Sequence, residues 1–394
     1  MTKRNSKLSG KHWALGAGAV VAAGAVAAAV TLTTGGTASS PAGHTGSSPA
    51  NLAASSCHGP AGAAYVADAG WDGFSAIDTA TGKVIQTYNV GDRPVPGNPG
   101  DYDFDSTGEA LAIHGNTLYF ADTGNSTVAV IDASKLDPSH YNPGETLINV
   151  GLNPQDLAVS PDGSQVWVAE TGPQTSASSP SAVSVISTAT GKVTARWTLP
   201  GAPAQIRFSP SGARVYVATA GGVAVYSTAT RKPAGFIRGL GDPRGLAVSP
   251  DGKSLYVTGT ESNQLYVIST ATDRITRAIK VGEMPWQVVA APDGKTAYVA
   301  NPDSNSVSVI SVASGAARAK VTSTLAVPGV PDTLALAPNG QRLWVGARIA
   351  AKVVVLSTAD GSTVGSINLG DAANAADGYA PTGIALTATP TAGS

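Results

Sequence analysis

Short runs of Val, Leu, Tyr and Ile recur along the chain, and turns rich in Pro, Asp, Asn and Gly separate them. Residues 245–281 hold "GLAVS", "SLYVTG", "QLYVIST" and "RITRAIKV", a pattern typical of four strands covered on both faces. The first two runs are joined by "PDG", in which Pro sets φ, Asp bonds its own backbone and Gly accepts a positive φ. The last two are joined by "ATDR", another tight turn. The pattern predicts a repeating unit of four strands.

This unit occurs seven times, with starts 40 to 54 residues apart. That spacing is typical of the four-stranded blade of a β-propeller. The expected second strands of the units begin at Ala64, Leu118, Val166, Val215, Leu255, Ala297 and Leu343.

The two ends of the repeat region complement each other. Residues 381–388, "PTGIALTA", look like a first strand with nothing after it, whereas the first unit begins at a second strand. We therefore expect an all-β, seven-bladed β-propeller of four-stranded antiparallel blades, in which the C-terminal strand joins the first blade and closes the ring. Closure removes the exposed sheet edges.

The turn-and-strand unit resembles the YVTN-type β-propeller repeat family. The best examples are "SPDGKSLYVTGTESNQLYVISTATDRI" and "APDGKTAYVANPDSNSVSVIS", and the resemblance covers about residues 63–388. It implies the propeller fold, but the family is diverse in role, so it implies little about function.

The N-terminal region is typical of an export signal. The first eleven residues hold four basic residues, an apolar run follows at 13–32, and small residues come next. We expect residues 1–38 to be a signal peptide cleaved near Ala38, or a retained signal anchor. Residues 39–62 are expected to be a flexible linker, 63–390 the propeller and 391–394 a tail. The expected location is secreted, extracellular or associated with the cell envelope of a bacterium.

Composition and charge limit the kinds of binding partner that we expect. Without the four N-terminal bases, 21 basic residues face 26 acidic ones, so the body carries about −5. No basic stripe is present, so we expect no nucleic-acid partner. Membrane contact is expected only through residues 13–32 if they stay uncleaved, and the protein is expected to be a monomer. The single cysteine, Cys57, excludes an internal disulfide and zinc sites of paired cysteines.

Enlarged loops are predicted on one face of the ring, which we call the top. This face holds the connections between second and third strands and those between blades. The enlarged loops are residues 91–108, 172–181 and 370–380, which fall in one sector and predict a canopy. Within the first, Asp101, Asp103 and Asp105 are candidate ligands of a divalent cation. Ser106 stands where an EF-hand needs Gly, so a solvated acidic loop is the alternative and no other cofactor is expected.

One residue per blade, two positions before the first apolar residue of each inner strand, differs from blade to blade. We expect these residues to ring the top mouth of the central channel, and we call them the mouth ring. We expect the mouth ring to line a polar ligand-binding pocket with one aromatic wall. The alternative is that these residues form inter-blade salt bridges and packing contacts. The mouth ring consists of Glu109, Gln155, Ala204, Arg244, Trp286, Asp332 and Thr382.

The expected propeller contains two histidines, His114 and His140, both in turns of the second blade on the bottom face. Asp137 and Glu145 lie near His140 in the sequence, so a metal site is one interpretation and two exposed histidines the other. Propeller lyases of the streptogramin-cleaving type use a top-face histidine with a metal, and we find no such histidine here.

Three classes of function remain. The first, which we favour, is an exported binding module for a small molecule, a glycan or a protein on the top face. The second is a propeller enzyme of the lyase or lactonase type, for which Glu109 and Asp332 are the available acid–base groups. The third is a structural cell-envelope protein, which depends on retention of residues 13–32 as an anchor.

Overall fold

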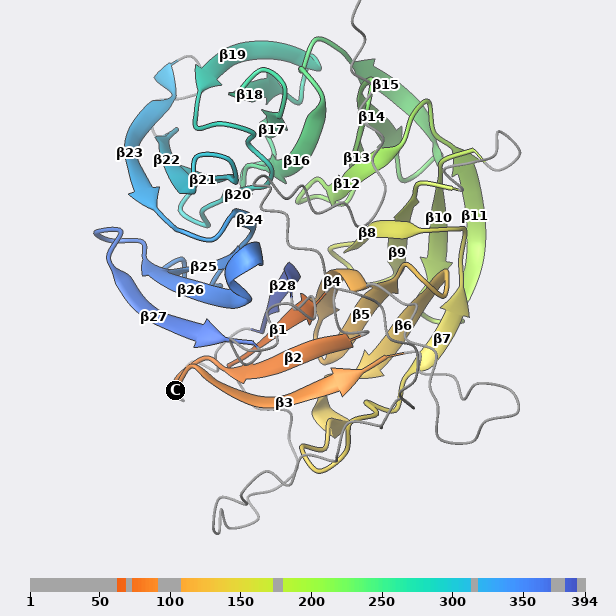
Figure 1. The fold of residues 1–394 in the computed structure, drawn as a ribbon. Helices are drawn as coiled ribbons and strands as arrows, with labels where there is room; N and C mark the ends of the chain where they lie inside the picture. Colours follow the sequence, from red (N-terminus) through yellow and green to blue (C-terminus); the bar gives the residue numbers. More distant parts are fainter. Residues whose placement is uncertain are drawn as a thin grey trace, which may run out of the picture. The chain divides into compact units, whose positions relative to one another are not determined.

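The computed structural model describes residues 62–68, 73–90, 108–172, 180–312, 318–369 and 380–387. The chain divides into two units, 1–56 and 57–394, and all described residues belong to the second. They form seven four-stranded antiparallel sheets arranged as blades around a centre (Figure 1). The predicted seven-bladed propeller is therefore confirmed.

The blades follow the chain in order, with the first strand of each blade innermost. Blade 1 consists of β28 (Pro381–Leu386), β1 (Ala63–Asp68), β2 (Gly73–Asp78) and β3 (Lys83–Asn89). Blade 2 consists of β4 (Gly108–His114), β5 (Thr117–Asp122), β6 (Thr127–Asp132) and β7 (Thr146–Asn149). Blade 3 consists of β8 (Pro154–Val159), β9 (Gln165–Glu170), β10 (Ala182–Ser187) and β11 (Lys192–Thr198).

The remaining four blades repeat this order. Blade 4 consists of β12 (Pro203–Phe208), β13 (Arg214–Thr219), β14 (Gly222–Ser227) and β15 (Lys232–Ile237). Blade 5 consists of β16 (Pro243–Val248), β17 (Ser254–Gly259), β18 (Gln264–Ser269) and β19 (Arg274–Lys280). Blade 6 consists of β20 (Val288–Ala290), β21 (Thr296–Asn301), β22 (Ser306–Ser311) and β23 (Lys320–Ala326). Blade 7 consists of β24 (Pro331–Leu336), β25 (Arg342–Ala347), β26 (Lys352–Ser357) and β27 (Thr363–Asn368).

The ring closes through β28, as the sequence predicted. This strand pairs antiparallel with β1, with Val66 opposite Ile384. The backbone N–H of Thr387 donates to the carbonyl of Ala63 (3.0 Å), and that of Ala380 donates to Asp68 Oδ1 (2.7 Å). Every residue of β1 is buried. The C-terminal strand thus supplies the inner edge of blade 1.

Hydrophobic side chains pack between neighbouring blades. Alternate residues of β1 point to opposite faces: Tyr65 joins the core shared with blade 2, and Val66 joins the core shared with blade 7. Seven such cores are present, one for each pair of adjacent blades. This arrangement explains the nearly continuous apolar runs, because inner strands are covered on both faces.

The repeated Pro-Asp-Gly turns are structural. At one of them Ser249 Oγ donates to Asp251 Oδ1 (2.6 Å), and the backbone N–H of Lys253 donates to the same oxygen (3.1 Å). Gly252 has a φ of 71°, which favours glycine. These contacts stay within the turn, which connects the first and second strands of the blade.

Several sequence predictions fall on residues outside the described ranges. These are the export segment, nearly all of the linker, the tail, the acidic loop with Asp101, Asp103 and Asp105, and most of the three enlarged loops. Among the residues that the structure does describe, no helix has the length and apolar character needed to cross a membrane.

Candidate functional site

A β-bulge in each blade positions the mouth ring. In blade 3 Pro154 pairs with Glu170 and Asp156 with Ala169, so Gln155 is left out of the ladder. The pairing passes over Glu109, Ala204, Arg244, Asp332 and Thr382 in the same way. In blade 6, the N–H of Trp286 donates to the carbonyl of Ala300, and the N–H of Ala300 donates to the carbonyl of Gln287, so two residues face one. A bulge redirects the extra residue, which is why the mouth-ring residues all lie at the channel entrance.

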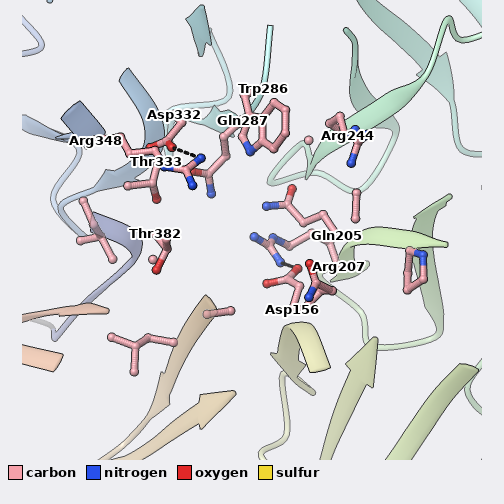
Figure 2. Close-up of a pocket in the computed structure, with 18 residues that line it drawn as sticks. Asp156, Gln205, Arg207, Arg244, Trp286, Gln287, Asp332, Thr333, Arg348 and Thr382 are labelled. Carbon is pink, nitrogen blue, oxygen red and sulfur yellow. Dashed lines mark hydrogen bonds and ion pairs between the residues drawn. The ribbon is translucent and has the colours of Figure 1, made fainter. Parts of the chain in front are cut away.

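A cavity of about 180 Å³ lies at this entrance (Figure 2). Its walls include six of the seven mouth-ring residues, and the seventh, Glu109, has a side chain outside the described part. Its other walls come from neighbouring residues of the inner strands and from Arg348. The mouth-ring residues on the cavity wall are Gln155, Ala204, Arg244, Trp286, Asp332 and Thr382. The structure therefore brings the predicted residues together, and their role in ligand binding stays a prediction.

Arg207 forms an ion pair with Asp156 on the cavity wall. Its Nη1 donates to Asp156 Oδ2 (2.6 Å) and to the carbonyl of Ile206 (2.6 Å). The backbone N–H of Ile206 donates to the same carboxylate oxygen (2.8 Å). Burial raises the pKa of the Asp156 carboxyl, and the neighbouring guanidinium opposes this shift. The pair joins blade 3 to blade 4 beneath the mouth ring.

Arg244 and Trp286 form the aromatic side of the cavity. The guanidinium lies over the indole at 5.2 Å from the ring centroid, and Arg244 Nε donates to Asp242 Oδ2 (3.1 Å). A cation over an indole ring is attracted by the ring quadrupole. The two contacts hold the arginine on the wall between blades 5 and 6.

Asp332 is paired with Arg348 across the cavity rim. Their Oδ2 and Nη1 atoms are 3.8 Å apart, and Asp332 is buried while the arginine is exposed. Arg348 begins a one-turn 3-10 helix, η3 (Arg348–Ala350), which follows β25 on the top face. These contacts, like that of Arg244 with Asp242, lie within one blade. An ion pair between blades, the role considered as the alternative for the mouth ring, is formed by the neighbouring residues Asp156 and Arg207.

Three inner-strand side chains bond the backbone of the next blade. Asp156 accepts from Ile206 as described, Gln205 Oε1 accepts from the N–H of Leu246 (2.6 Å), and Gln287 Oε1 accepts from that of Leu334. Each acceptor directly follows a mouth-ring residue. These three side chains therefore link neighbouring blades just below the mouth ring, and the bonds fix their orientation.

A second cavity, of about 550 Å³, lies at the opposite end of the channel. Most of the side chains on its walls are apolar, with Val159, Phe208 and Leu336 among them. Arg207 and Gln287 lie on the walls of both cavities. These two polar side chains therefore lie between the upper and the lower cavity.

Comparison with known proteins gives the family. A model described as the choice-of-anchor I domain matches residues 56–295, more than half of the chain. The chain belongs to the choice-of-anchor I domain family. A model of YNCE-like β-propellers also matches this choice-of-anchor I chain, over residues 257–378, which agrees with the predicted YVTN-type repeats. No curated protein matches it closely enough to serve as a relative.

Solved structures share the fold of the choice-of-anchor I chain at low sequence identity. A functionally unknown protein from Desulfotomaculum acetoxidans is 16% identical, with a TM-score of 0.67 and coverage of 83% of this chain and 99% of the other. The periplasmic gluconolactonase of Pseudomonas aeruginosa is 18% identical, with a TM-score of 0.61 and coverage of 84% and 99%. Hydrazine synthase of Kuenenia stuttgartiensis is 21% identical, with a TM-score of 0.58 and coverage of 71% and 89%. At these identities the likeness shows the fold alone.

The two described histidines of the choice-of-anchor I chain lie away from the channel. His114 packs against the turn at Gly163, and His140 Nδ1 lies 2.9 Å from Asp137 Oδ2. Within the described ranges, no group of three or more His, Cys, Asp or Glu side chains could hold a metal ion. The predicted alternative of a metal site at His114, His140, Asp137 and Glu145 therefore does not form there.

The sequence predictions missed Arg207 and Arg348, and also Asp156, Gln205 and Gln287, as residues of this site. Arg207 follows the first apolar residue of its inner strand, where five of the other blades carry Ala and one carries Val. This break in the repeat was a usable signal. Arg348 gives no comparable signal, because it reaches the cavity from a top-face connection whose conformation differs between blades.

Proposed function

We propose that this choice-of-anchor I protein is an exported binding module that holds its ligand in the upper cavity of the central channel. The ligand is a small molecule, or a small group displayed by a glycan or protein. One observation carries the proposal: the positions where the repeat varies from blade to blade line a single cavity. Scaffold positions such as the Pro-Asp-Gly turns repeat, whereas binding residues need to differ in chemistry.

The test is a ligand screen on the full chain by thermal shift and calorimetry, with small sugars, amino acids and organic acids as probes. Trp286→Ala and Thr382→Val alter the cavity wall, and Arg274→Ala, on the exposed face of β19, is the matched control. We expect ligands that stabilise the wild type to lose affinity in the two cavity variants and keep it in the control. Ligands whose binding is indifferent to both cavity variants would contradict the proposal.

Lactone hydrolysis is the second candidate function. Asp332 and Asp156 place carboxyl groups on the cavity wall, and burial raises the pKa of Asp156, as acid–base catalysis often requires. A gluconolactonase shares the fold, which shows only that the scaffold accommodates such chemistry. Turnover of glucono-δ-lactone that is lost in Asp332→Asn would favour this candidate. Binding of gluconate without turnover of the lactone would favour the binding module.

A further inference from the structure

The amide groups on the cavity wall present donors to the cavity. A backbone N–H can bond only to an acceptor, so the contacts with Leu246 and Leu334 fix the oxygens of Gln205 and Gln287 toward the next blade. Their NH₂ groups consequently take the other direction, and Figure 2 shows both nitrogens directed toward the cavity centre. The scaffold therefore turns the acceptor oxygens of these two side chains toward the next blade and leaves their NH₂ donors facing the cavity.

Each of the two carboxylates on the wall lies beside an arginine. Asp156 Oδ2 accepts from a backbone N–H and from Arg207, and Asp332 Oδ2 faces Arg348. The side chains of the two acids are 11% and 10% exposed, against 30% and 53% for the paired arginines. The accessible charge in each pair is therefore the positive one.

The three guanidinium groups retain donors. Each guanidinium has five N–H groups. Arg207 uses Nη1 and Arg244 uses Nε in bonds to described residues, while Arg348 makes only the 3.8 Å contact with its acid. The described residues accept no hydrogen bond from Nη2 of Arg207 or from either terminal nitrogen of Arg244. Forked donors of this kind match the oxygens of carboxylate and phosphate groups.

The volume limits the size of the ligand. Pockets for drug-sized molecules are about 300–1,000 Å³, whereas this cavity is about 180 Å³. We infer that the upper cavity is an oxyanion site, which takes a small carboxylate or phosphate, free or at the end of a larger molecule. The inference rests on the proposed binding function and adds the chemical class of its ligand.

Calorimetry of the full chain with succinate, inorganic phosphate and neutral erythritol tests the assignment. Arg348→Gln and Arg244→Gln remove one cation each, and Arg274→Gln on the exposed face of β19 is the matched control. Each cavity variant is expected to bind the anion about tenfold to a hundredfold more weakly, since one charge-assisted bond is lost. The control is expected to stay within about twofold, and affinity to fall as salt rises.

The results separate the oxyanion assignment from the proposed function. Selective binding of succinate or of phosphate supports the assignment and tells which oxyanion geometry the cavity prefers. Anion binding that Arg348→Gln and Arg244→Gln leave unchanged overturns it. Binding of erythritol that Trp286→Ala abolishes and both arginine variants spare overturns the assignment but keeps the binding function. Ligands that bind independently of every cavity variant overturn both.

Discussion

Removal of Asp156 tests whether the acceptors beneath the mouth ring hold neighbouring blades together. In Asp156→Ala, the N–H of Ile206 loses its 2.8 Å acceptor, and Arg207 loses its 2.6 Å partner. An unsatisfied buried donor costs about 1–3 kcal/mol, and loss of one partner of a fully buried ion pair about 3–5 kcal/mol. Because Arg207 is 30% exposed and water replaces part of its contact, we expect a loss of about 2–4 kcal/mol in the free energy of unfolding.

Two companion variants separate the causes. Asp156→Asn keeps an oxygen that can accept from Ile206 and removes the charge, so its loss in the free energy of unfolding is expected to be about half that of Asp156→Ala. Asp303→Ala, at an exposed position between β21 and β22, is the control, with an expected loss within about 0.5 kcal/mol. Urea denaturation followed by circular dichroism gives the three values. The reasoning fails if Asp156→Ala is as stable as the control, or if Asp156→Asn is no better than Asp156→Ala.

Three further predictions concern the turns, a close backbone approach and export. Hydrogen bonds from Ser160 and Ser164 lower the pKa of Asp162 from its ordinary 3.8 to about 2. The contribution of Asp162 to stability is therefore present above pH 3.8 and is lost as the pH falls through about 2. NMR titration should give a pKa near 2 for this carboxyl, and Asp162→Asn should make the stability of the protein less sensitive to acid. A Cβ on Gly245 would lie 2.4 Å from the carbonyl oxygen of Trp286, so Gly245→Ala should displace Trp286 and alter its fluorescence and ligand affinity, whereas Gly365→Ala, with open space around it, should change neither. Mass spectrometry of the protein exported from a bacterial host should find the mature N-terminus near residue 39; an intact residue 1 on membrane-bound protein would show a retained anchor instead.

The fold was predictable from the sequence because the repeat carries the information several times over. Most blades have their own turn signal and their own apolar strands, so a unit that departs from the pattern, such as blade 2 with "HGN" in place of the Pro-Asp-Gly turn, is identified by its neighbours. Closure was predictable as well, since one strand lacked a blade at one end of the repeat and one blade lacked a strand at the other. Both features are local patterns, which a single sequence displays directly.

The site was predictable only in part. Gln155, Arg244, Trp286, Asp332 and Thr382 were found because the mouth ring starts each inner strand and breaks the repeat. The partners of these residues were not found, because pairing across blades depends on the bulge that shifts the next side chain toward its neighbour. The donor character of the cavity could not be predicted either, since it depends on which amide oxygens the scaffold already uses.

A crystal structure of the full chain soaked with succinate or phosphate tests most directly whether the mouth ring binds a ligand. We predict density for the anion in the upper cavity, with oxygens within hydrogen-bond distance of Arg244 and Arg348 and in reach of the amide nitrogen of Gln287. Anion density in the lower cavity or on the outer strands, with the upper cavity empty at saturating concentration, would contradict this prediction.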